Sequence, residues 1–138
     1  MGMVMTKVKL TNDAELEMAR RRLIEAALVR TVEIEALVDT GATDLVLPAD
    51  VVAKLGLTHQ GTRPVSYADG RRARVPWVSG VRIEILGREM SCDALVMPEG
   101  TTPLIGQIPL EGLDLVVDPK SRDVRVNPES PDGPLMRL

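Results

Sequence analysis

The chain has almost no aromatic side chains. Its 138 residues include no phenylalanine, one tyrosine (Tyr67) and one tryptophan (Trp77). The hydrophobic core is therefore expected to be aliphatic, and the aromatic platforms on which single-stranded nucleic acids stack are lacking. The net charge of −3 at pH 7 gives no electrostatic reason to expect nucleic acid or an anionic membrane. The composition thus predicts neither a nucleic-acid partner nor a membrane partner.

Cysteine, histidine and long apolar runs are also scarce. Cys92 stands alone and cannot form a disulfide within the chain, and His59, the single histidine, cannot build a zinc site of the usual kinds by itself. No apolar run approaches the roughly 20 residues of a membrane-spanning helix, and the N-terminus lacks the apolar stretch of a secretory signal. We therefore expect no metal, no cofactor and a cytoplasmic location.

What the sequence does contain is a series of short alternating segments separated by glycine and proline turns. This pattern predicts a single, mostly-β, barrel-like domain with one or two short helices. The expected strands are 4–10, 30–38, 45–47, 78–86, 90–97, 114–118 and 123–126, with a hairpin over 64–75 and helices over 14–22 and 48–55. Residues 23–29 fit a continued helix as well as a strand or loop, and 59–64 are expected to form a polar loop.

One stretch carries chemistry. The segment 32–38 alternates and then becomes wholly apolar, so it predicts a strand that runs into the core and delivers Asp39 at its buried end. A buried carboxylate costs several kcal/mol unless it is paired, hydrogen-bonded or protonated. Thr40 supplies a hydroxyl and Gly41 an unscreened backbone N–H. Taken alone, Asp-Thr-Gly is more often an ordinary turn than a catalytic site.

Its context changes that interpretation. The block Leu37-Val38-Asp39-Thr40-Gly41-Ala42 resembles the active-site loop of retropepsin-like (clan AA) aspartic proteases, of the stand-alone bacterial and archaeal type that is similar to the retroviral enzyme. A second family element, an apolar pair followed by glycine ahead of a short helix, is matched by Leu104-Ile105-Gly106. The resemblance covers about residues 30–126, which we take as the protease domain. Residues 1–29 add a strand and a helix that lie partly outside it, and 127–138 are expected to be a loose tail.

The resemblance also implies roles for individual residues. Asp39 would be catalytic, and Thr40, Gly41 and Ala42 would complete the loop that holds it and meets the substrate backbone. Thr43, Asp44 and Ile105 would line the substrate cleft, and the hairpin with its tip at Ala68-Asp69-Gly70 would close over the substrate as a flap. The viral enzymes often carry an acid and an arginine at the places of Thr43 and Gln107, so a hydrogen bond is expected here in place of an ion pair.

The number of catalytic carboxylates in one chain determines the oligomeric state that we expect. Aspartic protease chemistry needs two carboxylates that face one water, one as base and one as proton donor. This chain has one Asp-Thr-Gly, and the nearest rival acid, Asp118, is followed by Pro119 and lacks both the hydroxyl and the glycine. The prediction is therefore a homodimeric aspartic endopeptidase that acts on a peptide or protein substrate. A weakly catalytic or non-catalytic module that dimerises or binds peptides is the alternative, which the charged hairpin tip favours.

Overall fold

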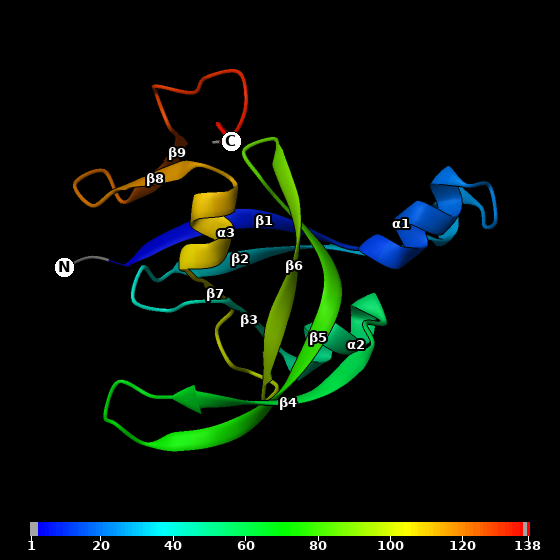
Figure 1. Ribbon diagram of the computed structural model, residues 1–138, viewed down its shortest axis with the longest axis horizontal. Helices are drawn as coiled ribbons and strands as arrows, with labels where there is room; N and C mark the ends of the chain where they lie inside the picture. The colour runs from blue at the N-terminus through cyan, green and yellow to red at the C-terminus, as the bar shows by residue number, and fades with distance from the viewer. Residues whose placement is uncertain (1–2, 137) are drawn as a thin grey trace.

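The computed structural model describes residues 3–136 and 138, and β-structure dominates it. Strands make up 47% of the chain and helices 18%. Seven strands form one sheet in the order β1-β2-β7-β3-β6-β5-β4, and β1 also pairs with β5, so the sheet curls back on itself as a barrel (Figure 1). The predicted mostly-β, barrel-like class is confirmed, with three short helices instead of one or two.

The elements follow one another along the chain with short connections. Their bounds are β1 (Val4–Asn12), α1 (Asp13–Arg20), a 3-10 turn (Ala26–Leu28), β2 (Thr31–Val38), β3 (Leu45–Pro48), α2 (Ala49–Leu55), β4 (His59–Ser66), β5 (Arg72–Ile85), β6 (Arg88–Met97), β7 (Leu104–Ile105), α3 (Gln107–Gly112), β8 (Leu115–Asp118) and β9 (Asp123–Val126). β8 and β9 form a separate antiparallel hairpin, as predicted from the sequence.

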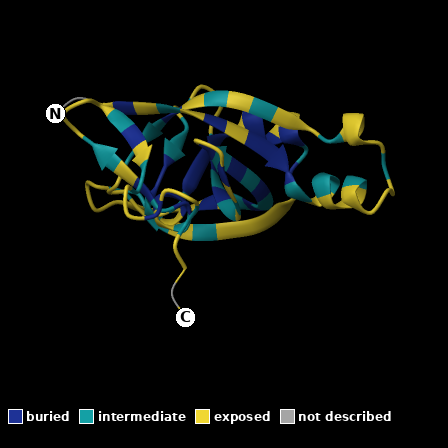
Figure 2. Ribbon diagram, turned by 90° about the horizontal axis from the view of Figure 1, so that it is seen from above, coloured by how far each residue is buried: buried dark blue, intermediate teal, exposed yellow. Residues whose placement is uncertain are grey.

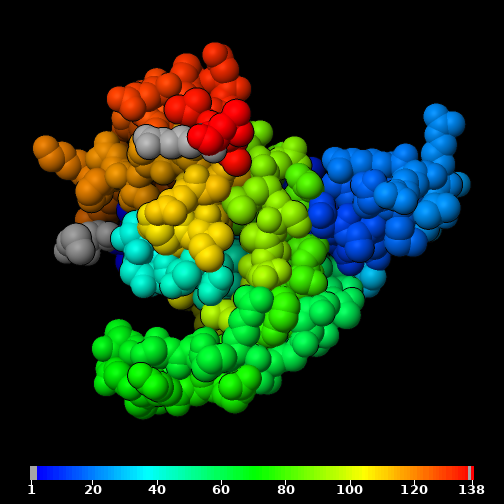
Figure 3. Space-filling model, viewed as in Figure 1, coloured from blue at the N-terminus to red at the C-terminus, as the bar shows by residue number. Residues whose placement is uncertain are grey.

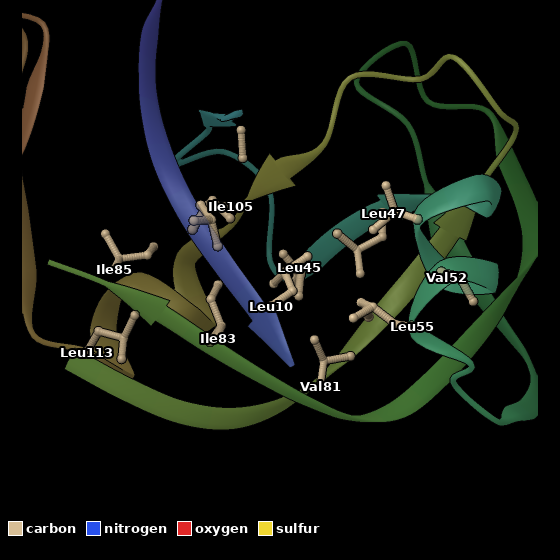
Figure 4. Close-up of a cluster of buried hydrophobic side chains, with 14 of the residues drawn as sticks. Leu10, Leu45, Leu47, Val52, Leu55, Val81, Ile83, Ile85, Ile105 and Leu113 are labelled. Atoms are coloured by element: carbon tan, nitrogen blue, oxygen red, sulfur yellow. The ribbon is translucent and has the colours of Figure 1, made fainter. Parts of the chain in front are cut away.

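The core is aliphatic, as the shortage of aromatic residues predicts. Its largest fully buried side chains come from β1, β3, β5, β7, α2 and the end of α3, and include Leu10, Leu45, Leu47, Leu55, Ile83, Ile85, Ile105 and Leu113 (Figure 4). Burying one such side chain contributes about 1.5–3 kcal/mol. The branched side chains therefore stabilise a closed barrel without any large ring to fill it.

A short strand, β7, interlocks with the two strands that flank the Asp39 loop. It pairs in parallel with β2 through Leu37 and Leu104, and antiparallel with β3 through Leu45 and Ile105. The backbone N–H of Asp39 donates to the carbonyl of Ile105 at 3.0 Å. A segment more than sixty residues away in sequence thus fixes both ends of the loop, which β2 and β3 alone would leave unpaired.

Gly106 continues this contact from β7 into the loop itself. Its N–H donates to the Asp44 carbonyl at 3.0 Å, and the next two N–H groups, of Gln107 and Ile108, donate to Ala42 and Thr43 at 2.8 and 2.9 Å. A β-carbon at Gly106 would lie only 2.4 Å from the Asp44 carbonyl oxygen. Only glycine allows the two backbones to approach this closely.

The residues between β1 and β2 form a helical lobe that projects from the barrel (Figure 2). α1 has no buried residue, so its own packing cannot hold the lobe in place. Asn12 does so at the base, because its amide donates to the Leu55 carbonyl at 2.8 Å while its oxygen caps α1 by accepting from the Glu15 N–H at 3.1 Å. Arg30 closes the other side through a bidentate pair with Glu15.

Two sequence predictions about the sheet were wrong. Residues His59–Pro64 are not a loop but most of β4, the last strand in the sheet order, and they are polar because nearly all of them are exposed. The segments 72–75 and 78–85 are not separate strands but one 14-residue strand, β5. It bends at an irregularity between Val78 and Val81, where Gly80 has φ = 73°.

The C-terminal segment differs from the loose tail that its composition predicts. Arg88 is 6% exposed, and its guanidinium donates to the carbonyls of Leu113, Asp114 and Ser130. The Asp114 carboxylate accepts from Ser130, from the Asn127 amide and from the Leu135 N–H. These polar contacts, which no sequence periodicity reveals, fasten residues Asn127–Leu135 to the domain.

Replacing Gly106 should disrupt the loop more than replacing Gly41. In Gly106→Ala the new β-carbon meets three backbone atoms at 2.4–2.8 Å, whereas in Gly41→Ala it meets only the Asp39 carboxylate at 3.2 Å. We expect Gly106→Ala to lower the free energy of unfolding by about 3 kcal/mol, and Gly41→Ala by less than about 1 kcal/mol, in urea denaturation. Equal losses in the two variants would contradict the close-approach explanation.

Asp114 should make the free energy of unfolding depend on pH. Hydrogen bonds from the Ser130 hydroxyl, then from the Asn127 amide and the Leu135 N–H, lower the pKa of its carboxyl below the ordinary value. The stabilisation is therefore present above the unfolded-state pKa, near 4, and is lost as pH falls through the lower folded-state pKa. We expect Asp114→Asn to lose less stability than wild type between pH 7 and pH 3 in urea unfolding.

Asp132→Asn is the matched control for that experiment. It removes one carboxylate from the same segment, and Asp132 makes no hydrogen bond to any residue that the structure describes. The control should retain the wild-type pH dependence. An Asp114→Asn variant with that same dependence would show that the tail contacts do not depend on the carboxylate charge.

Candidate active site

Asp39 stands at the first position after β2, on a tight turn. The Gly41 N–H donates to its Oδ1 at 2.9 Å, and the Ala42 N–H donates to its carbonyl at 3.1 Å. The strand before it is anchored in the core by Ala36, which is fully buried. Local hydrogen bonds and the β7 contact therefore hold the carboxylate in one orientation.

The carboxylate is less buried than the sequence predicts. Asp39 is half-buried, and Thr40 and Gly41 beside it are exposed. The reason is that the loop leaves the core at the end of β2 and lies on the surface of the single chain. The acid, its neighbouring hydroxyl and an unscreened backbone are thus presented together on one accessible loop.

The far end of the loop is held by main-chain bonds. The carbonyls of Ala42, Thr43 and Asp44 all accept from the residues that begin α3, as described above. The predicted hydrogen bond between the side chains of Thr43 and Gln107 is not formed, because the Gln107 amide donates to Glu111 at 2.9 Å within its own helix. The backbone pairing leaves no need for a side-chain link at this place.

A hollow separates this loop from the β4–β5 hairpin. In Figure 3 the hairpin (green) extends below the body of the protein, and the Asp39 loop (cyan) faces it across the open space. The hairpin turn lies where the sequence predicts it, with Ala68, Asp69 and Gly70 all exposed at the tip. Gly70 has φ = 86°, a conformation that glycine adopts without strain.

The charged side chains at the tip of the hairpin form an ion pair with one another. Asp69 accepts from the backbone and the guanidinium of Arg71 at 3.0 and 2.7 Å, and these bonds, the backbone one first, lower the pKa of its carboxyl. The Arg71 guanidinium also lies over the Tyr67 ring, 4.9 Å from its centroid. The tip is therefore a structured turn.

Strand register separates the remaining hairpin arginines from Arg63. Arg72 and Arg74 lie opposite Ser66 and Pro64, whereas Val75, which is buried, lies opposite Arg63. Paired residues share a face of a hairpin, so Val75 and Arg63 lie on one face and Arg72 and Arg74 on the other. The face of Val75 thus lacks the charges of Arg72 and Arg74.

The structure brings together most of the residues that the sequence singles out. Asp39, Thr40, Gly41, Ala42, Thr43 and Asp44 share one loop, and Ala68, Asp69 and Gly70 lie together at the exposed tip of the β4–β5 hairpin. Ile105 is the exception, because it is fully buried in the core. Its role is to support the loop from beneath, so its prediction as a residue that lines the substrate cleft is wrong for the single chain.

One group beside the loop is not predicted by the sequence. Arg63 on β4 donates to Asp93 on β6 at 3.0 Å, and its guanidinium stacks 3.6 Å from the centroid of Trp77. These residues are far apart in the chain, and only the pairing of β4, β5 and β6 makes them neighbours. No local motif could have identified them.

Arg63 and Asp93 also line a cavity of about 330 Å³ that reaches Asp44 at the end of the Asp39 loop. Cys92, in the wall, is half-buried. Burial first, and then the nearby charges of Asp93 and Asp44, raise the pKa of its thiol to about 12, so it remains protonated. A slightly larger cavity of about 360 Å³ lies over β1 and β2, where no residue of the loop reaches it.

We also looked for a metal-ion site and for a membrane-spanning helix among the described residues. Within residues 3–136 and 138, no three His, Cys, Asp or Glu side chains gather as ligands for a metal ion. None of the helices among those residues is long and apolar enough to cross a membrane. The Asp39 loop is thus the feature around which a reaction can be described.

Comparison with known proteins agrees with this geometry. No curated protein matches the chain. The family model described as aspartyl protease matches residues 26–109, a range that includes the Asp39 loop, the β4–β5 hairpin and β7 with Gly106. The match spans more than half of the chain and covers the elements that hold the carboxylate in place. The chain therefore belongs to the aspartyl protease family of clan AA.

Proposed function

We propose that this protein is an aspartic endopeptidase that acts as a homodimer, with one Asp39 from each chain. The observation that supports this most directly is the presentation of a single Asp-Thr-Gly loop, half-buried at Asp39 and exposed at Thr40 and Gly41, on the surface of one chain. Family membership supports a peptidase in general. The pairing of two chains is our inference from the count of carboxylates.

The reaction requires two carboxylates around one water. One carboxylate takes a proton from the water while its protonated partner donates to the oxygen of the scissile carbonyl. Two carboxylates at contact distance cannot both ionise cheaply, so they share a proton and titrate as a pair, as is general for aspartic proteases. In the proposed dimer Asp39 supplies one member of that pair. The Gly41 N–H, which holds Oδ1 at 2.9 Å, fixes its orientation.

The hairpin and the loop would hold the substrate between them. An extended peptide would lie in the hollow between the β4–β5 hairpin and the Asp39 loop (Figure 3). Val65 and Ala73 are paired on one face of that hairpin, which would suit apolar side chains of the substrate. Thr43 and Asp44 would contact residues on either side of the scissile bond.

A peptide-binding module without turnover is the alternative, and the charged hairpin tip is the feature that favours it. Its weight is reduced because Asp69 pairs with Arg71, and because Arg72 and Arg74 lie on the face of the hairpin opposite to Val65 and Ala73. A scaffold would also have no need for an oriented acid in this loop. The endopeptidase is therefore the function that the site supports best.

Cleavage of a peptide library tests the activity. We expect Asp39→Asn to lower kcat/KM by at least about a thousandfold while the fold and thermal stability are kept, because the amide cannot take the proton from water. The measurement is mass-spectrometric detection of products between pH 4 and pH 7. Hydrolysis that is equal in wild type and Asp39→Asn, or no hydrolysis by wild type at any pH, would remove the endopeptidase proposal.

Mixing the two proteins tests the dimer. If the active species needs two intact copies of Asp39, activity should follow the square of the wild-type fraction after subunit exchange with Asp39→Asn. An equal mixture would then retain about a quarter of the activity of the same total amount of wild type, whereas independent chains would retain about half. A linear dependence after confirmed exchange would show that one chain is sufficient.

A further inference from the structure

The cavity at the end of the active-site loop has the chemistry of a side-chain pocket. Its walls include the apolar residues Leu45, Met90, Ile108 and Pro109, and its polar groups are Asp44, Arg63, Asp93, Ser91 and Cys92. Its volume of about 330 Å³ falls in the range of ligand sites, roughly 300–1,000 Å³. Asp44 comes from the loop that carries Asp39, and Arg63 comes from β4 of the hairpin. The cavity thus lies between the Asp39 loop, the hairpin, β6 and α3.

The charges in the cavity do not cancel. Arg63 is occupied, since it donates to Asp93 at 3.0 Å and stacks on Trp77 at 3.6 Å. Cys92 is neutral because its thiol pKa is raised to about 12. Among residues 3–136 and 138, no donor or cation pairs with the carboxylate of Asp44, which is half-buried. One carboxylate therefore remains unneutralised beside apolar walls.

We propose that this cavity is a specificity subsite for the side chain of a lysine or arginine in the substrate, and that Asp44 recognises its charge. Such side chains have an apolar stem and a cationic head, and they gain most where the stem lies on apolar surface and the head meets a carboxylate. The hairpin and the cavity then select an extended chain that is apolar near the scissile bond and basic at one flanking position. This inference depends on the proposed function, because it names the substrate class of the same site.

Arg63 affects the preference of the subsite for cationic side chains, because it forms an ion pair with Asp93. While the two are paired, Asp93 contributes no net charge to the cavity. If Arg63 is removed, the Asp93 carboxylate becomes a second free anion in the same space. The subsite should then prefer a cation more strongly, so Arg63 and Asp44 variants are expected to move specificity in opposite directions.

The experiment is a position-scanning decapeptide library in which one position at a time is fixed as lysine, arginine, methionine or glutamate. With wild type we expect lysine and arginine to exceed methionine in kcat/KM by about five- to tenfold at one flanking position, the size expected of one partly exposed ion pair. Asp44→Asn should bring that ratio close to one. Arg63→Met should raise it above the wild-type value.

Glu25→Gln is the matched control. It removes one carboxylate from the lobe between β1 and β2, where Glu25 is exposed and its side chain makes no cap hydrogen bond. The lysine-to-methionine ratio should remain as in wild type. Because Asp44 makes no side-chain hydrogen bond within the described residues, Asp44→Asn should unfold at the wild-type temperature, and any lost preference then reports recognition.

The outcomes separate this inference from the proposed function. Asp39-dependent cleavage without a cation preference, or with one that Asp44→Asn leaves unchanged, overturns the subsite and leaves the endopeptidase intact. If wild type cleaves nothing, the endopeptidase fails, and the subsite is measured by equilibrium binding of the lysine-fixed and methionine-fixed pools to the Asp39→Asn protein. Equal binding of the two pools, or a difference that persists in Asp39→Asn/Asp44→Asn, overturns the subsite as well.

Discussion

The contact between Gly106 and the Asp39 loop is the constraint on which the candidate site depends. A loop between two strands would ordinarily vary in conformation, but here β7 enters between β2 and β3, and three successive N–H groups bond the carbonyls of Ala42, Thr43 and Asp44. This pairing requires the two backbones to approach within a distance that excludes any β-carbon at Gly106. The orientation of the acid is thus set by main-chain geometry, and the residues that line the hollow can vary without displacing it.

In the proposed homodimer, a loop fixed in this way would make the single chain half of a site. The turn orients one carboxylate and leaves Thr40 and Gly41 exposed, although an oriented acid on the surface gains little stability from its hydrogen bonds to the loop. The exposure of this loop is understandable if the same loop of a second chain covers it. Two carboxylates that share a proton and act on one water must both be held in a fixed orientation for the reaction. In the proposed dimer, the support from β7 would supply that condition from within each chain.

The sequence predicts the parts of this structure that local patterns encode. Alternation reveals most strands, and the two motifs around Asp39 and Ile105 reveal the loop and its support. The errors arise where distant partners decide the structure. The segment His59–Pro64 has too few apolar residues to be read as a strand, yet β5 pairs with it at the end of the sheet. The tail of the chain is fastened by the buried Arg88, whose partners are carbonyls that no sequence motif marks. Asp39 is less buried than its apolar approach suggests because the loop leaves the core within one residue.

The same long-range pairing explains why the charge pattern of the hairpin is misleading when it is taken from the sequence alone. Arg63, Arg71, Arg72 and Arg74 all fall within twelve residues and suggest a basic flap. Alternation and local pairing give them different surroundings: Arg72 and Arg74 share one face of the hairpin, Arg71 is bound to Asp69, and Arg63 lies on the opposite face and pairs with Asp93. The arginine that reaches the cavity is therefore neutralised by Asp93, and the carboxylate left without a partner among the described residues is that of Asp44. A hairpin that is basic in sequence thus borders a cavity that is acidic in space, so under the proposed function electrostatic selection there should favour basic substrate residues.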